Sequence, residues 1–353
     1  MRKQIVSVIV VCGGLLLGLS LCSCSTYYYQ SVTGQLAVFS AQQPIAPLLA
    51  SPDVTLPAAV RDKLTWVLQT RDFATNVLKL PDNDSYRLYA DLQRPYVVWS
   101  VMAAAELSLT PETWCYPIIG CAVYRGYFDR VAAQAFADTL VAQGLDVSVQ
   151  GVPAYSTLGW FDDPIFHAVL QWPKAHIAGL IFHELAHAQI YVKGDSAFNE
   201  SFATAVEIEG VRRWLQASGD ESAWQHFQTR KTVKKTFIAF VRTFRQRLSE
   251  LYAKPMAAPE MRRHKQQIFV DMLAAYEPMK VQWGGFSGYD AWMQQVNNAK
   301  MNTVTTYHQY VPAFQVLLAQ SGGDLAVFYQ HVADVGALDA AVRQQRLQAL
   351  VSD

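Results

Sequence analysis

Two histidines and one glutamate in the middle of the chain have the spacing of a metal-binding helix. His183 and His187 are four residues apart, so both imidazoles lie on one face of a helix and can bind the same metal ion. Glu184 follows the first histidine, where it can accept a proton from a water molecule that the metal polarises. The pattern predicts a hydrolytic metal site; the alternative is a helix with two ordinary core or surface histidines.

A candidate third ligand follows in the next predicted helix. Gly194, Asp195 and Ser196 form a loop with an N-cap residue, and Glu200 lies in the first helical turn after it. Two histidines on one helix and a glutamate on the next make the His₂Glu set of a catalytic zinc site, with the fourth position open. Glu207 returns to the face of Glu200 and is a candidate acceptor for a ligand imidazole N–H; otherwise it is an ordinary surface carboxylate.

The elements that position these residues are predicted from hydrophobic spacing. Helical spacing extends over 58–80, and a small mixed section with short strands at 96–99, 121–124 and 145–149 and a helix at 128–143 follows. The remaining pattern is helical, with helices expected at 174–192, 197–216, 220–253, 258–279, 301–320, 323–334 and 337–350. We therefore expect an α+β fold in which a small mixed sheet section (57–163) and a mainly helical section (164–353) share one core.

Composition excludes several classes of protein. Hydrophobic residues make up 51% of the 353 residues and charged residues 16%, which is incompatible with a disordered chain. The formal net charge is +0, whereas a nucleic-acid binder needs a basic excess. Nucleic acid is therefore not an expected partner.

The N-terminus has the pattern of an export signal. Arg2 and Lys3 precede an apolar stretch from Ile5 to Leu21, and residues 1–24 are predicted to be a lipoprotein signal peptide. The window ending in Cys24 resembles the lipobox of bacterial lipoproteins, with Cys24 as the lipidated residue; the alternative is a plain signal peptide or an uncleaved anchor. By the same resemblance Ser25 suits retention at the outer membrane, facing the periplasm. Residues 25–56 are expected to form a tether and an irregular lead-in, with a possible short helix at 31–40.

Two cysteines remain in the predicted mature chain after Cys24. Cys115 and Cys121 flank a Tyr-Pro turn, and disulfides persist in the oxidising compartment that the signal implies. We expect them to form a disulfide; the alternative is two buried thiols.

The metal motif excludes one class of zinc peptidase and resembles another. Metzincins need glycine and histidine where this chain has Ile190 and Lys193. His183 to His187, followed by the Asn199-Glu200 pair, resembles the gluzincin signature of thermolysin and aminopeptidase N relatives. The chain is more similar to the bacterial predicted-aminopeptidase lipoprotein family, through this motif and the stretches 124–128, 154–161 and 297–299.

The resemblance implies further site residues. Zincins hold the substrate backbone on an edge strand, and the segment 154–161, with Tyr155, Ser156 and Thr157, or the strand leading into it, is the candidate here. Relatives use a tyrosine or histidine to stabilise the oxyanion; Tyr307 is the candidate, although packing is the commoner role for a single tyrosine.

These observations favour an envelope-anchored zinc peptidase, acting as an aminopeptidase on short peptides, with Zn²⁺ held by His183, His187 and Glu200. Two alternatives remain open. One is a binding or assembly lipoprotein on a zincin-like fold without catalysis, and the other is a zinc amidase that acts on peptidoglycan peptides.

Overall fold

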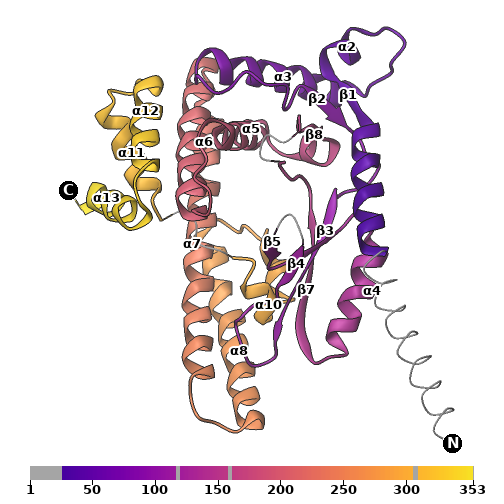
Figure 1. The fold of residues 1–353 in the computed structure, drawn as a ribbon, viewed down its shortest axis with the longest axis vertical. Coiled ribbons are helices and arrows are strands. Elements are labelled where there is room, and N and C mark those ends of the chain that lie inside the picture. Colours follow the sequence, from indigo (N-terminus) through magenta and orange to yellow (C-terminus); the bar gives the residue numbers. More distant parts are fainter. Residues whose placement is uncertain (1–25, 117–119, 158–160, 305–308, 353) are drawn as a thin grey trace, which may run out of the picture.

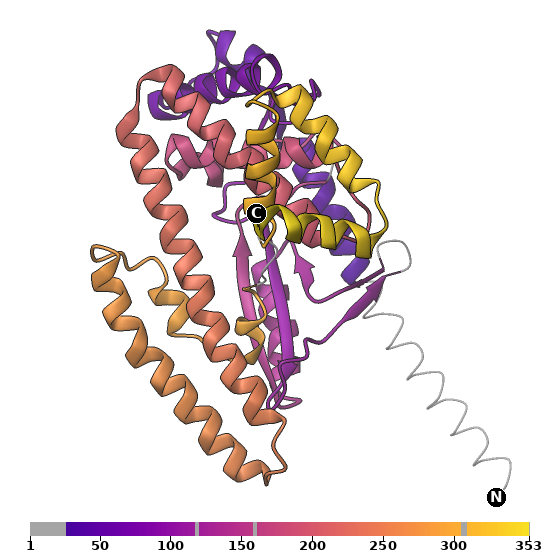
Figure 2. The same cartoon turned by 90° about the vertical axis from the view of Figure 1, so that its left-hand side faces the viewer.

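The computed structural model describes residues 26–116, 120–157, 161–304 and 309–352. About 62% of the structure is helical and the strands form only small sheets, so the predicted α+β class is confirmed. Helix α7 (Glu221–Tyr252) extends along much of the molecule, and α6 (Ser196–Ser218) leads into it at one end (Figures 1 and 2).

The largest core surrounds helix α5 (Lys174–Gln189). Its buried residues include Ile177, Ala178, Gly179 and His187, which face several directions around the helix, as expected for a central helix. Helix α5 packs on α6 and on α3 (Ala58–Asn76). A short sheet at the same end pairs β2 (Leu88–Ala90) with β1 (Gln42–Pro44) antiparallel and with β8 (Ile165–Phe166) parallel. Helix α2 (Ile45–Ala50) directly follows β1, and the 3₁₀ turn η1 (His167–Gln171) directly follows β8.

A second sheet lies below α5 in Figure 1. Strand β3 (Val98–Ala105) is central, with β6 (Arg125–Tyr127) and β7 (Leu145–Val152) antiparallel on its two sides. The pairing of β3 with β7 runs from Val98 opposite Val152 to Ala105 opposite Leu145. Helix α4 (Arg130–Val141) packs against this sheet. Strands β4 (Trp114–Tyr116) and β5 (Gly120–Ala122) form a separate pair in which Cys115 and Cys121 are opposite each other and joined by a disulfide.

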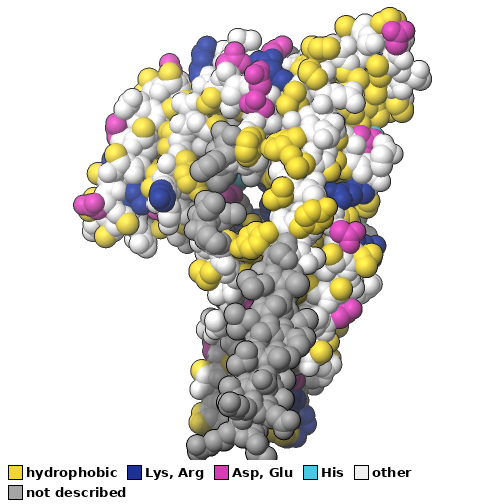
Figure 3. Space-filling view, turned by 45° about the vertical axis from the view of Figure 1, so that its right-hand side comes forward, with side chains coloured by type: hydrophobic (Ala, Val, Ile, Leu, Met, Phe, Trp, Pro, Cys, Tyr) yellow, Lys and Arg dark blue, Asp and Glu magenta, His cyan; other side chains and the backbone are white. Residues whose placement is uncertain are grey.

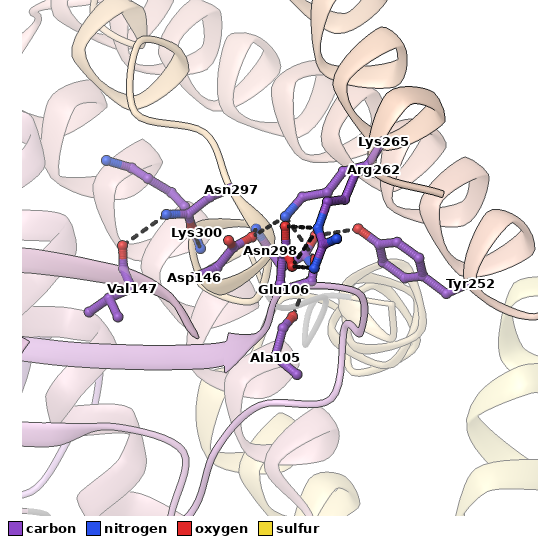
Figure 4. A network of polar contacts seen from close by, with 10 residues as sticks. All are labelled: Ala105, Glu106, Asp146, Val147, Tyr252, Arg262, Lys265, Asn297, Asn298 and Lys300. Carbon is purple, nitrogen blue, oxygen red and sulfur yellow. Dashed lines mark hydrogen bonds and ion pairs between the residues drawn. The ribbon is translucent and has the colours of Figure 1, made fainter. Parts of the chain in front are cut away.

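Helix α8 (Ala258–Gln282) returns alongside α7 to form a helical hairpin, which a polar network attaches to the second sheet (Figure 4). Asn298, fully buried at the start of α10 (Asn298–Met301), donates to the carbonyls of Ala105 and Glu106 and accepts from the Tyr252 hydroxyl. The backbone N–H of Asn298 donates to Asp146. This gives a structural role to the 297–299 stretch. Short α9 (Asp290–Met293) precedes it, and α11 (Val311–Gln320), α12 (Leu325–Gly336) and α13 (Ala340–Ser352) follow.

Most predicted helices agree with the structure, with two clear differences. The helix predicted over 301–320 is wrong at the described residues 302–304 and 309–310, because α10 ends at Met301 and α11 begins at Val311, where Pro312 occupies the first turn. Residues 26–41, expected within a tether, form a helix that packs on the second sheet section. Among the described helices, none is both long enough and apolar enough to cross a membrane.

Candidate metal centre

The loop between α5 and α6 brings the candidate ligands together. The side chain of Asp195 caps α6 by accepting from the backbone N–H of Phe198 at 2.9 Å. The amide of Asn199 donates to the carbonyl of Val192 and accepts from its N–H, both at 2.8 Å. Asn199 therefore fastens the loop to the first turn of α6, and Glu200, the next residue, faces α5.

His183, His187 and Glu200 offer one ligand atom each within 4.8 Å of one another. His183 Nε2 lies 3.3 Å from Glu200 Oε2, and His187 Nε2 lies 3.5 Å from Glu200 Oε1. A tetrahedral zinc site with bonds of about 2.0–2.1 Å has ligand–ligand edges of about 3.3–3.4 Å. The spacing and the donor set therefore fit a divalent metal ion.

The second nitrogen of His183 faces another carboxylate. Its Nδ1 lies 3.6 Å from Glu207 Oε2, and Glu207 Oε1 lies 2.5 Å from Lys231 Nζ of helix α7. Gly179, one turn before His183, leaves room for this carboxylate, since a Cβ there would lie 3.0 Å from Glu207 Oε1. A carboxylate behind a ligand imidazole orients the ring and makes it a stronger ligand. His187 differs, because its buried Nδ1 has no hydrogen-bond partner among the described residues.

The electrostatics of the site follow from these contacts. Burial lowers the pKa of His183, but hydrogen bonds to Glu200 and Glu207 outweigh it and raise the pKa to about 9. Contacts with His183 and His187 hold the pKa of Glu200 well below its ordinary value. Burial raises the pKa of Glu207, but His183 and Lys231 lower it to about 2. Both carboxylates are thus ionised at neutral pH, the state in which they can bind or support a metal.

Glu184 lies in a different environment from the ligands. Burial raises its pKa, an effect that the charges of His183 and His187 and a hydrogen bond from Ser156 partly offset. A carboxyl group with a raised pKa suits proton transfer near neutral pH. Glu184 borders a small cavity of about 30 Å³, which can hold one water molecule.

Tyr86 lines the same cavity and was not found from the sequence. Its backbone has φ 65°, an unusual conformation for a bulky residue. The backbone N–H of Tyr86 donates to the carbonyl of Asp163 at 2.7 Å, and fully buried Arg71 donates to the carbonyls of the preceding loop, including those of Asn83 and Ser85. Burial and the charge of Glu184 raise the pKa of Tyr86.

The segment expected to hold substrate lies close to Glu184. Ser156 donates to Asp163, and Asp163 also accepts from the backbone N–H of Thr157. The Tyr155 ring packs against Phe166, and its hydroxyl donates to Gln35 at 2.6 Å. Strand β7, which leads into this segment, is at the edge of its sheet in the described part of the chain.

Two predicted site residues cannot be compared with the structure, and some residues of the observed site were not predicted from the sequence. Tyr307 and Cys24 lie outside the described residues. Lys231 and Tyr86 had no signal in the sequence, because each reaches the site from an element far away along the chain. Gly179, four residues before His183, could have been noted from spacing alone.

Comparison with known protein families matches residues 26–347 to a family described as "Putative aminopeptidase". No curated protein and no solved structure matches the chain significantly. The family description indicates a peptidase acting on peptides. Since the match covers nearly all described residues, the candidate metal centre included, the chain belongs to this family.

Proposed function

We propose that this protein is a zinc-dependent peptidase of the bacterial cell envelope, with a zincin-like arrangement of the helices that carry its site, and that it acts as an aminopeptidase on short peptides. The observation that carries the proposal is the convergence of His183, His187 and Glu200 at the spacing of a tetrahedral zinc site, with Glu184 beside them. The family to which the chain belongs supports the peptidase class.

His183, His187 and Glu200 hold the metal ion in this proposal, and Glu207 orients His183. The bound ion supplies Lewis-acid polarisation of the scissile carbonyl and of water. Glu184 accepts the proton of the attacking water and returns it to the leaving amine, and its buried position keeps the carboxylate poised for both transfers. Tyr155, Ser156 and Thr157 contact the substrate peptide, and Tyr307 is the proposed donor to the oxyanion.

Envelope anchoring is the second part of the proposal. Cys24 carries the lipid, the signal before it is removed, and the domain faces the periplasm from the outer membrane. The lipobox-like window at Leu21 to Cys24 supports this location, and the disulfide between Cys115 and Cys121 suits an oxidising compartment.

The test compares metal content and peptide hydrolysis in the full chain and two variants. We expect about one zinc in the parent, loss of metal in Glu200→Ala, and retained metal with hydrolysis slowed about 10²–10⁴-fold in Glu184→Gln. Full activity of a metal-loaded Glu184→Gln variant would disprove the mechanism. The substrate panel contains short peptides and muropeptides, so that cleavage of muropeptides alone would identify an amidase instead.

A further inference from the structure

The helix over residues 26–41, called here the N-terminal helix, carries apolar side chains on its outer face. Its inner side carries the half-buried residues Gln30, which donates to the carbonyl of Gly126 and accepts from the N–H of Phe128, and Gln35, which accepts from Tyr155. Its outer side carries Tyr28, Tyr29, Val32 and Leu36, which are 44%, 71%, 58% and 56% exposed. Val38 and Tyr27 also pack inward, so this helix is apolar on both sides. The outer side of a helix on a water-soluble domain is ordinarily polar.

The four outer residues form one continuous stripe. Positions 28, 32 and 36 are spaced by four, and 29 lies beside 28, so they share one helical face. No Asp, Glu, Lys or Arg occurs between residues 26 and 52. Val270 and Val281, two exposed apolar residues on α8, have charged residues between them. Figure 3 shows hydrophobic side chains gathered on this side of the molecule.

The N-terminal helix is fixed to the domain. Gly34 packs directly on the ring of Phe128, since a Cβ at residue 34 would lie within 2.5 Å of that side chain. Val38 is 1% exposed, and Phe39 makes an edge contact with Phe161. These contacts hold the outer stripe in one orientation relative to the rest of the domain.

We propose that the N-terminal helix lies in the interface of the lipid bilayer, with Tyr28, Tyr29, Val32 and Leu36 turned into the membrane. This proposal rests on the lipid anchor at Cys24 in the proposed function, since that residue is only two positions before the described helix. Tyrosine suits the membrane–water boundary because its ring is apolar and its hydroxyl is polar. The helix spans about 24 Å at 1.5 Å per residue and lies in the plane of the interface.

A bilayer fits the stripe better than a second copy of the chain. Stable protein interfaces bury about 800 Å² per partner, whereas four side chains on one helix bury on the order of half that area. A stripe without charges also offers no ion pairs to fix the orientation of a partner protein.

The orientation has a consequence for the candidate metal centre. The N-terminal helix contacts Tyr155 through Gln35, and the side chain of the next residue, Ser156, contacts Glu184 as well as Asp163. Two steps of direct contact thus connect the bilayer-facing helix to the proposed general base. The protein holds its site at a fixed position near the membrane surface, where a peptide attached to or adsorbed on the bilayer is within reach.

The test uses the full chain, expressed with its signal and reconstituted into vesicles of phosphatidylethanolamine and phosphatidylglycerol. A Leu36→Cys variant carries an environment-sensitive fluorophore, and Val281→Cys, 79% exposed on α8, is the matched control. Peptide mapping confirms the labelled position and reports the lipid on Cys24. Lipids with nitroxide groups are then added to both samples.

We expect nitroxide lipids to quench the probe at residue 36 at least several-fold more than the probe at residue 281. Equal and weak quenching at both positions, in protein that carries its lipid and sediments with the vesicles, would overturn this inference and leave the anchor intact. Strong quenching at residue 36 without a lipid on Cys24 would support the inference and contradict the anchor. If the probe at residue 36 is blue-shifted but nitroxide lipids do not quench it, protein covers the stripe. That outcome would also overturn the inference.

Discussion

The imidazole of His183 lies between two carboxylates, with Glu207 Oε2 3.6 Å from its Nδ1 and Glu200 on its other side. Lys231 of α7 contacts the far oxygen of Glu207, so three helices contribute to the orientation of one ligand ring. Glu200 is thus the candidate metal ligand, whereas Glu207 orients the ring of His183. Substitutions at the two residues test these roles independently.

Replacing Glu207 by glutamine should weaken metal binding without unfolding the domain. The glutamine side chain keeps the size of the glutamate against Gly179 but loses the charge that makes His183 a stronger ligand. We expect zinc affinity to fall about 10–100-fold, the usual cost of losing such a partner, as measured by competition with a chelator. Parental affinity in a folded Glu207→Gln variant would show that the carboxylate is not needed.

Two glycines near α5 should respond differently to alanine. At Gly179 the new Cβ displaces the Glu207 carboxylate by a few tenths of an ångström, so Gly179→Ala should lower zinc affinity several-fold while stability changes little, because alanine favours the helix by up to about 1 kcal/mol. At Gly210 the Cβ would lie 2.6 Å from the Phe182 ring. Gly210→Ala should therefore cost about 1–3 kcal/mol of unfolding free energy, as denaturant titration can measure.

The two substitutions are the same change, glycine to alanine, on two helices, α5 and α6, that pack on each other. A difference between their effects therefore reports the surroundings of each glycine. If Gly179→Ala binds zinc as the parent does and loses stability as Gly210→Ala does, the Glu207 carboxylate does not depend on the space at residue 179.

The helices that carry the ligands were predictable because local rules determine them. Asp195 caps α6 as expected, and Gly219, with φ 70°, ends it. The i, i+4 spacing placed His183 and His187 on one face, and the position of Glu200 in the next first turn brought it opposite them. Helical geometry fixes the first relation, whereas the second also depends on the loop that Asn199 fastens to α6.

The remaining features depend on tertiary packing or reverse the usual patterns. Lys231 reaches Glu207 from another helix, and Tyr86 reaches Glu184 from a loop that buried Arg71 holds. The N-terminal helix was expected within a tether that held only a possible short helix at 31–40. Its exposed apolar residues on the outer face lack the polar side that identifies a surface helix.

Replacing Asn199 by alanine should loosen the loop that precedes Glu200. The Asn199 side chain is 2% exposed and makes both hydrogen bonds to the backbone of Val192. Losing them should cost about 1–3 kcal/mol of unfolding free energy and should also weaken zinc binding, because Glu200 follows directly. Equilibrium unfolding and chelator competition measure the two effects. Destabilisation with unchanged zinc affinity would show that Glu200 is positioned without the loop.

Glu209 should make stability depend on pH through its contacts with two arginines. Arg212 and Arg213 both donate to its carboxylate at 2.6–2.7 Å, and Arg213 also donates to the carbonyl of Gly323, in the turn before α12. Burial raises the pKa of Glu209, but the hydrogen bonds from the two arginines outweigh it and hold the pKa below the ordinary value of 4.5. The folded state thus binds this proton less readily than the unfolded chain does.

The sign of the pH effect follows from linkage. A lowered pKa in the folded state contributes stability above pH 4.5, and that contribution is lost as the pH falls through the folded-state pKa. Glu209→Gln should therefore be less stable than the parent at pH 7 by about 1.5–3 kcal/mol, and the difference should shrink steadily below pH 4.5. Glu277→Gln, which affects an exposed ion pair with Lys280, is the control and should change stability little at any pH. Denaturant unfolding of the three proteins between pH 3 and pH 7 measures the difference, and a gap that stays constant across this range would rule out an ionised Glu209 as its source.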